Sequence, residues 1–164
     1  MESILQNTTI LLLVLLTGLS AGLCFTWSNS ITSGIGKLND LGYLQSFQQL
    51  NRSILNPLFF FIFFGPFFIN IINLYLFKDH SNIIIMLGLA AVIYFLGVIV
   101  ITIFGNVPLN ELLDKIDLNT LNNIEIKELR MQFELKWNRL HMIRTVASFL
   151  SFLILSYTIL KHKI

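Results

Sequence analysis

Four long runs without a charged residue constrain the fold of this chain more than any other feature. The runs predict membrane-spanning helices at about residues 4–27, 57–77, 82–105 and 142–160. Backbone amides in a bilayer must be hydrogen-bonded within the protein, so runs of this length form helices. Of the 164 residues, 55% are hydrophobic and 12% are charged, which is typical of a polytopic membrane protein. We therefore predict an all-α integral membrane four-helix bundle, with residues 1–164 as a single domain.

Charge balance and residue counts exclude several classes of function. The 11 Lys and Arg nearly balance the 9 Asp and Glu without clustering, which argues against nucleic-acid binding. The lone Cys24 cannot form a disulfide within the chain or a paired-cysteine metal site. His80 and His162 flank spans on the side opposite His141, and no His-x-x-x-His or Glu-x-x-His pair exists. We therefore expect neither a metal site nor a haem.

The polar segments between the spans predict three further features on one side of the membrane. Ser28 to Gly36 is rich in Ser, Thr, Asn and Gly, which favours an irregular loop. Asp40 to Asn56 predicts a short amphipathic interfacial helix, because Tyr43 and Phe47 fall on its apolar face. The run from Asn106 to Asn110 contains a proline and predicts the end of a helix followed by a turn.

The last helix is expected to begin well outside the membrane. Asn122 with Glu125 three residues later resembles a reciprocal helix cap, and no Pro or Gly follows. One continuous helix of about 38 residues is about 57 Å long, so its first half protrudes from the bilayer. Spacings of four and three place a polar and aromatic stripe along one face of this helix: Arg130, Glu134, Trp137, His141 and Arg144.

The membrane end of this stripe is the strongest candidate site. Thr145 to Leu160 is uncharged but spans only about 24 Å of a bilayer core of about 30 Å. Arg144 and His141 therefore lie at or just inside the boundary, where ionisable groups usually face a bundle interior. A neutral imidazole can take a proton near neutral pH, and a guanidinium one turn away can stabilise the resulting anion. Trp137 and Arg144 also suit a purely anchoring role at the membrane surface.

Polar residues elsewhere on the stripe side are weaker candidates for substrate binding. Asn106 and Asn110 suit either hydrogen-bond donors at a pocket mouth or ordinary helix-end residues. Arg52 and Asn56 precede Pro57 and suit either the site or a solvated helix face. On the first span, a line at helical spacing suits either the site or, more often, helix packing: Ser20, Cys24 and Trp27.

The distribution of basic residues favours a cytoplasmic stripe side. That side carries Lys37, Arg52, Lys115, Lys127, Arg130, Lys136, Arg139 and Arg144, and the other carries Lys78, Lys161 and Lys163. If three of these residues face a pocket, namely Arg52, Arg139 and Arg144, the count becomes five basic residues against three. That difference gives little support to either orientation. We expect a multi-pass protein of the bacterial cytoplasmic (inner) membrane.

Three segments together resemble the anthrone oxygenase-like family of small four-span membrane proteins. They are Asn51-Arg-Ser-Ile-Leu-Asn-Pro57, Gly105-Asn-Val-Pro-Leu-Asn110 and Trp137-Asn-Arg-Leu-His-Met-Ile-Arg144. The resemblance covers nearly the whole chain, in order and with compatible spacing. Characterised members insert oxygen from O2 into an anthrone to give an anthraquinone, without flavin, haem or metal. The resemblance thus implies a cofactor-independent monooxygenase, or a binder of lipophilic aromatic compounds.

Carried onto this chain, the resemblance implies a role for each candidate. His141 would be the base that removes an acidic proton, and Arg144 with Arg52 would stabilise the enolate. The remaining substrate-binding candidates would contact its rings and oxygens: Trp137, Asn56, Asn106 and Asn110. Two alternatives stay open: a non-catalytic accessory protein that binds a partner subunit or lipid, and, less favoured, a small transporter.

Overall fold

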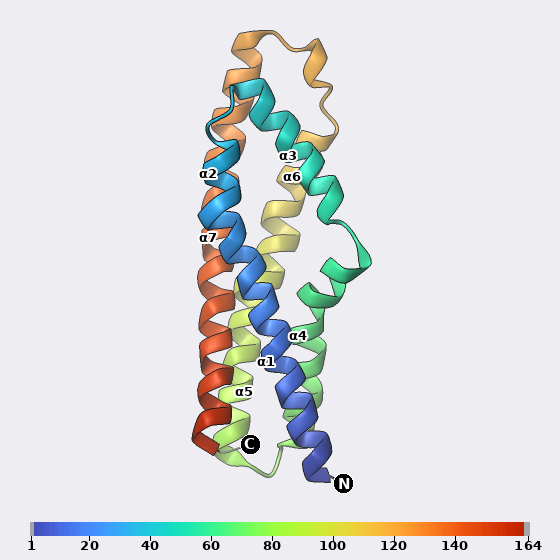
Figure 1. Cartoon of the computed structure of the whole chain (residues 1–164), viewed down its shortest axis with the longest axis vertical. Helices are drawn as coiled ribbons and strands as arrows, with labels where there is room; N and C mark the ends of the chain where they lie inside the picture. Colours follow the sequence, from blue (N-terminus) through green and yellow to red (C-terminus); the bar gives the residue numbers. More distant parts are fainter. Residues whose placement is uncertain (1, 163–164) are drawn as a thin grey trace.

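The structure is a computed structural model that describes residues 2–162, and its regular elements in that range are all helical (Figure 1). The elements are α1 Glu2–Thr26, η1 Trp27–Ile31, α2 Thr32–Ile35, α3 Asp40–Ile54, α4 Pro57–Leu76, α5 Ser81–Tyr94, η2 Phe95–Val100, η3 Thr102–Asn106, α6 Val107–Asp114, η4 Leu118–Thr120 and α7 Asn123–His162. The first three η elements are π-helical, and η4 is a 3-10 turn. The all-α prediction is confirmed.

Within the described residues, four helical segments are long and apolar enough to cross a membrane, which makes this an integral membrane protein. They are Ser3–Ile35, Pro57–Leu76, Ser81–Asp114 and Asn123–Lys161. Helix α1 packs on α4 and α7, and α5 packs on α7. The four segments consequently lie side by side, with the chain ends at the same end of the molecule (Figure 1).

Two predicted interruptions turn out to be helical. The loop expected at Ser28 to Gly36 is wrong, because η1 and α2 continue α1 to Ile35. The Thr32 hydroxyl donates to the carbonyls of Trp27 and Ser28, and Arg130 donates to the carbonyl of Gly36. These contacts outweigh the loop-forming composition of the segment.

The turn expected between Asn106 and Asn110 is also wrong. There η3 runs directly into α6, and Pro108 occupies the first turn of that helix. A proline in the first turn lacks only an N–H that has no partner within the helix in any case. The third span therefore extends without a break to Asp114.

The structure confirms a short helix between the first two spans and the start of the long last helix. Helix α3 spans Asp40–Ile54 and ends two residues before the predicted Asn56. The Asn122 Oδ1 atom accepts from the backbone N–H groups of Ile124 and Glu125, and the Glu125 carboxylate accepts from the Asn122 N–H. Helix α7 then runs for 40 residues, about 60 Å.

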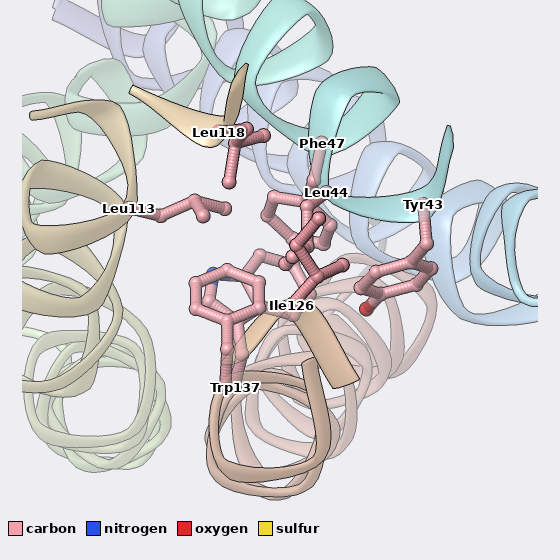
Figure 2. Close-up of a cluster of buried hydrophobic side chains, with 8 residues drawn as sticks. Tyr43, Leu44, Phe47, Leu113, Leu118, Ile126 and Trp137 are labelled. Atoms are coloured by element: carbon pink, nitrogen blue, oxygen red, sulfur yellow. The ribbon is translucent and has the colours of Figure 1, made fainter. Parts of the chain in front are cut away.

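A hydrophobic cluster packs α3 against the first half of α7, which we expect to lie outside the membrane. Side chains from α3, α6, η4 and α7 converge in it (Figure 2): Tyr43, Leu44, Phe47, Leu113, Leu118, Ile126, Phe133 and Trp137. Trp137 thus belongs both to this cluster and to the polar stripe.

Helix lengths locate the stripe-side membrane boundary. Helix α4 has 20 residues and is about 30 Å long, which matches the bilayer core. Because α4 begins at Pro57, the boundary lies at that level. The same length, measured from the far ends of the other spans, places the boundary near Cys24, Thr102 and Met142.

Candidate functional site

A cavity of about 340 Å³ lies at this boundary, lined by residues of α1, η1, α3, α4, η3, α6 and α7. Its aromatic walls are Trp27, Phe47, Phe59, Phe63 and Trp137. Its polar lining includes Ser20, Asn51, Thr102, Asn110, His141 and Arg144. Mostly apolar walls with a few polar groups are typical of a small-molecule site, and this volume is within the usual range.

Trp137 is held in one orientation at the centre of the site. Its indole N–H donates to Asn110 Oδ1 at 2.7 Å, and the Asn110 amide donates to Asn51 Oδ1 at 2.8 Å. The ring stacks on the His141 imidazole, with centroids 4.8 Å apart and planes 15° apart. The Trp27 ring lies 5.4 Å away on the α1 side.

His141 has hydrogen-bond partners at both ring nitrogens. The side chain is only 4% exposed, and its Nε2 lies 3.1 Å from the Cys24 carbonyl oxygen. A carbonyl oxygen can only accept, so Nε2 carries the proton in this arrangement. Nδ1 lies 2.6 Å from Arg144 Nη2 and accepts from it. The imidazole is therefore a neutral tautomer whose lone pair is directed at Arg144.

Arg144 lines the cavity without a carboxylate partner. Its Nη1 donates to Thr102 Oγ1 at 3.0 Å, and its Nη2 donates to His141. Its Nε–H is buried and has no hydrogen-bond partner within the part of the chain that the structure describes. Among the described side chains, those of residues 3–161, the ion pairs involve Arg52 and Arg130, and none involves Arg144. A guanidinium with unused donors and no counter-ion, set in an aromatic wall, can stabilise an anionic oxygen.

The structure brings some of the predicted site residues together in this cavity. Trp137, His141, Arg144 and Asn110 all line it. Asn106 lies behind the wall, where its buried amide donates to the Trp137 carbonyl at 3.3 Å and so ties η3 to α7.

The structure does not bring Arg52 or Asn56 to the cavity. Arg52 pairs through Nε with Asp114 Oδ1 at 2.6 Å, and its side chain is 50% exposed. Asn56 caps α4, with its side-chain oxygen accepting from the Phe59 N–H at 3.0 Å. Both residues are neighbours in sequence of cavity-lining residues, but their own side chains bind partners outside the cavity.

The outer end of the stripe has a structural role. Arg130 pairs with Glu134 and Asp40 and also donates to the carbonyls of Leu38 and Gly36. Burial raises the pKa of the nearby Tyr43 hydroxyl, the Glu134 carboxylate raises it further, and Arg130, 4.5 Å above the ring, opposes both. This network ties the end of α2 and the start of α3 to α7.

Sequence reasoning missed Thr102 and Asn51 as site residues and favoured helix packing over a site for Trp27. Thr102 lies in an uninterrupted apolar run, where one hydroxyl carries no signal of a site. The line of Ser20, Cys24 and Trp27 was a usable signal, because all three residues line the cavity.

A family model described as Anthrone oxygenase matches residues 59–154, more than half of the 164 residues. The matched range contains Thr102, Asn110, Trp137, His141 and Arg144. Comparison with the curated proteins finds no significant match, and comparison with the solved structures finds none either.

Proposed function

This chain belongs to the anthrone oxygenase family, and we propose that its cavity binds a lipophilic aromatic compound and catalyses its oxygenation by O2 without a cofactor. The observation that carries the proposal is the Arg144 guanidinium, which faces an aromatic cavity and has no carboxylate partner among the side chains of residues 3–161. A phenolate or enolate oxygen supplies the missing negative charge, and the aromatic walls accommodate the rings.

His141 is the proposed base, and binding of the substrate would make it available. Its Nδ1 lone pair accepts from Arg144 Nη2 at 2.6 Å. A substrate oxygen that accepts this N–H in place of Nδ1 releases the lone pair. Nδ1 then takes the proton from the acidic carbon of the substrate, while Arg144 stabilises the enolate.

The remaining steps take place between the substrate and O2, apart from the return of one proton from His141. The enolate gives electrons to O2, and a bond forms between the deprotonated carbon and one oxygen atom. The proton on His141 returns to the product, which is a hydroperoxide. Loss of water from the hydroperoxide breaks the O–O bond and leaves a quinone carbonyl. One oxygen atom of O2 remains in the product, and the other leaves as water.

The test is turnover of an anthrone by the protein in lipid nanodiscs. We expect anthraquinone to form faster than in protein-free nanodiscs. His141→Gln retains an acceptor for Arg144 and a donor for the Cys24 carbonyl, but it removes the base. Turnover by this variant should fall about 100-fold, while ligand affinity stays within about threefold. His80→Gln, at an exposed position, is the matched control. Equal rates for the wild type and His141→Gln contradict the assignment of the base.

A second candidate function is binding without turnover. The engagement of both His141 nitrogens favours it, because an imidazole held in this way takes no proton. Its signature is saturable quenching of tryptophan fluorescence by a hydroxylated anthraquinone, with no quinone formed from an anthrone above the background rate. Saturable binding together with turnover contradicts it.

We propose that the membrane is the bacterial inner membrane and that the cavity side faces the cytoplasm. Neither Arg52 nor Arg139 lines the cavity. With only Arg144 turned inward, seven basic residues remain on this side against three on the other. A cysteine introduced at Lys127 should react with a membrane-impermeant thiol reagent in inverted vesicles but not in intact cells.

A further inference from the structure

We propose that the ligand reaches this cavity sideways from the bilayer, through a portal between α1 and the connection from α3 to α4. The portal residues are Leu23, Thr26, Ile54, Leu55 and Phe59. This inference rests on the proposed function in so far as the cavity binds a lipophilic ligand.

The portal residues line the cavity and also reach the outer surface. Leu23 is 40% exposed and Leu55 is 58% exposed, yet both contribute to the cavity wall. A side chain that does both lies at a mouth. The connection that carries Leu55 runs along the outside of the molecule between α3 and α4 (Figure 1).

The portal lies at the level of the lipid rather than above it. Helix α4 begins at Pro57 and just spans the bilayer core, so Leu55 and Phe59 lie on either side of the boundary. On α1 the boundary falls near Cys24, beside Leu23. The mouth is therefore next to the acyl chains and headgroups of one leaflet.

The chemistry of the rim suits a lipophilic ligand. None of the portal residues is charged, and Arg52, their charged neighbour in sequence, is paired with Asp114. Exposed apolar side chains continue from the rim over the lipid-facing surface, among them Leu19 and Leu58. The polar groups of the cavity, Arg144 and His141, lie inside this apolar mouth. A hydrophobic compound can thus move from the leaflet to its hydrogen-bonding partners without crossing water.

The two tryptophans of the chain, Trp27 and Trp137, both line the cavity, so the intrinsic tryptophan fluorescence of the ligand-free protein reports on it alone. In vesicles of phosphatidylcholine brominated high in the acyl chain, we expect this fluorescence to be quenched. Leu55→Cys, alkylated with a bulky thiol reagent, should obstruct the portal and reduce the quenching. Leu58→Cys, treated in the same way, is exposed beside the portal but does not line the cavity and should show no reduction. Treated wild type controls for reaction at Cys24.

Two results would overturn the portal. One is bromolipid quenching that is unaffected by the Leu55 adduct. The other is strong quenching by aqueous iodide with none by bromolipid, which would show that the cavity opens to water.

A kinetic experiment separates this inference from the proposed function. With a hydroxylated anthraquinone as the probe, the Leu55 adduct should slow association about tenfold, with equilibrium affinity kept within about threefold. Wild type that binds no probe, yet shows quenching sensitive to the adduct, contradicts the proposed function and supports the portal. Tight binding with an unchanged association rate contradicts the portal alone.

Discussion

Two regions of α7 each place an arginine over an aromatic ring, and they differ in how that arginine is satisfied. At the outer end, Arg130 lies 4.5 Å from the Tyr43 ring and binds two carboxylates and two backbone carbonyls. At the cavity, Arg144 lies 5.5 Å from the Trp137 ring, and its hydrogen-bond partners among the described residues are a hydroxyl and an imidazole.

This difference distinguishes a structural guanidinium from one available for binding. The N–H groups of Arg130 donate to acceptors at the end of α2, at the start of α3 and on α7. Removal of Arg130 therefore leaves several acceptors without a donor. Arg144 sits deeper in apolar surroundings and keeps an unpaired buried N–H. An uncompensated charge at a membrane boundary is unfavourable for the isolated protein and becomes favourable when an anion binds.

The largest expected effect is on ligand affinity in Arg144→Met. Loss of two charge-assisted hydrogen bonds to a phenolate should weaken binding about 100-fold. The thermal stability of this variant should change little, because removal of an uncompensated charge offsets the loss of the donor to His141 Nδ1 and Thr102 Oγ1. Fluorescence titration with a hydroxylated anthraquinone and thermal unfolding in nanodiscs measure the two quantities.

Arg130→Met is the matched control, with the opposite expected pattern. Its free energy of unfolding should fall by about 2 kcal/mol, because the carbonyls of Gly36 and Leu38 and the carboxylate of Glu134 lose their donor. Ligand affinity should change by less than about twofold. If Arg144→Met destabilises the protein as much as Arg130→Met does, the distinction between the two regions fails.

A smaller effect is expected from the hydroxyl that holds Arg144. Thr102 donates to the Val98 carbonyl and accepts from Arg144, whereas Thr17 makes the same bond to its own helix, at Leu13, without contacting the site. Thr102→Val should reduce ligand affinity about fivefold, which corresponds to about 1 kcal/mol. Thr17→Val removes an equivalent hydroxyl and should leave affinity unchanged. Equal losses in both variants would mean that the effect is general to the helices.

Much of this fold was predictable because hydropathy and helix caps act over short stretches of sequence. Charge-free runs marked the four spans, and the Asn122 and Glu125 pair marked the start of α7. Helical spacing also predicted that Trp137, His141 and Arg144 share a face, and all three line the cavity. The helical continuation from Ser28 to Ile35 was harder to predict, because one of the contacts that hold it comes from Arg130, distant in sequence.

Helical spacing also did not predict which partner a side chain binds after its helix has packed against the others. Asn106 and Asn110 were predicted together, yet one amide holds the α7 backbone and the other holds the Trp137 indole. The Asp114 partner of Arg52 is 62 positions away, so nothing local to Arg52 indicated it. Packing between elements decided each case.

The smallest expected effect follows from the position of Arg52. The resemblance to the family implies that Arg52 stabilises an enolate together with Arg144. In the structure, however, the Arg52 guanidinium pairs with Asp114 at an exposed position. Arg52→Gln should therefore change ligand affinity by less than about twofold. The stability change should be at most about 1 kcal/mol and should shrink at high salt, because solvent screens an exposed ion pair.

Asp114→Asn is the control for Arg52→Gln, since it breaks the same pair from the side of α6. Matching small effects in both variants would show that the pair only joins α3 to α6. A tenfold loss of affinity in Arg52→Gln alone would mean that Arg52 leaves Asp114 and turns to the ligand. In that case two arginines would share the anionic oxygen, and the contrast between Arg130 and Arg144 would no longer explain binding by itself.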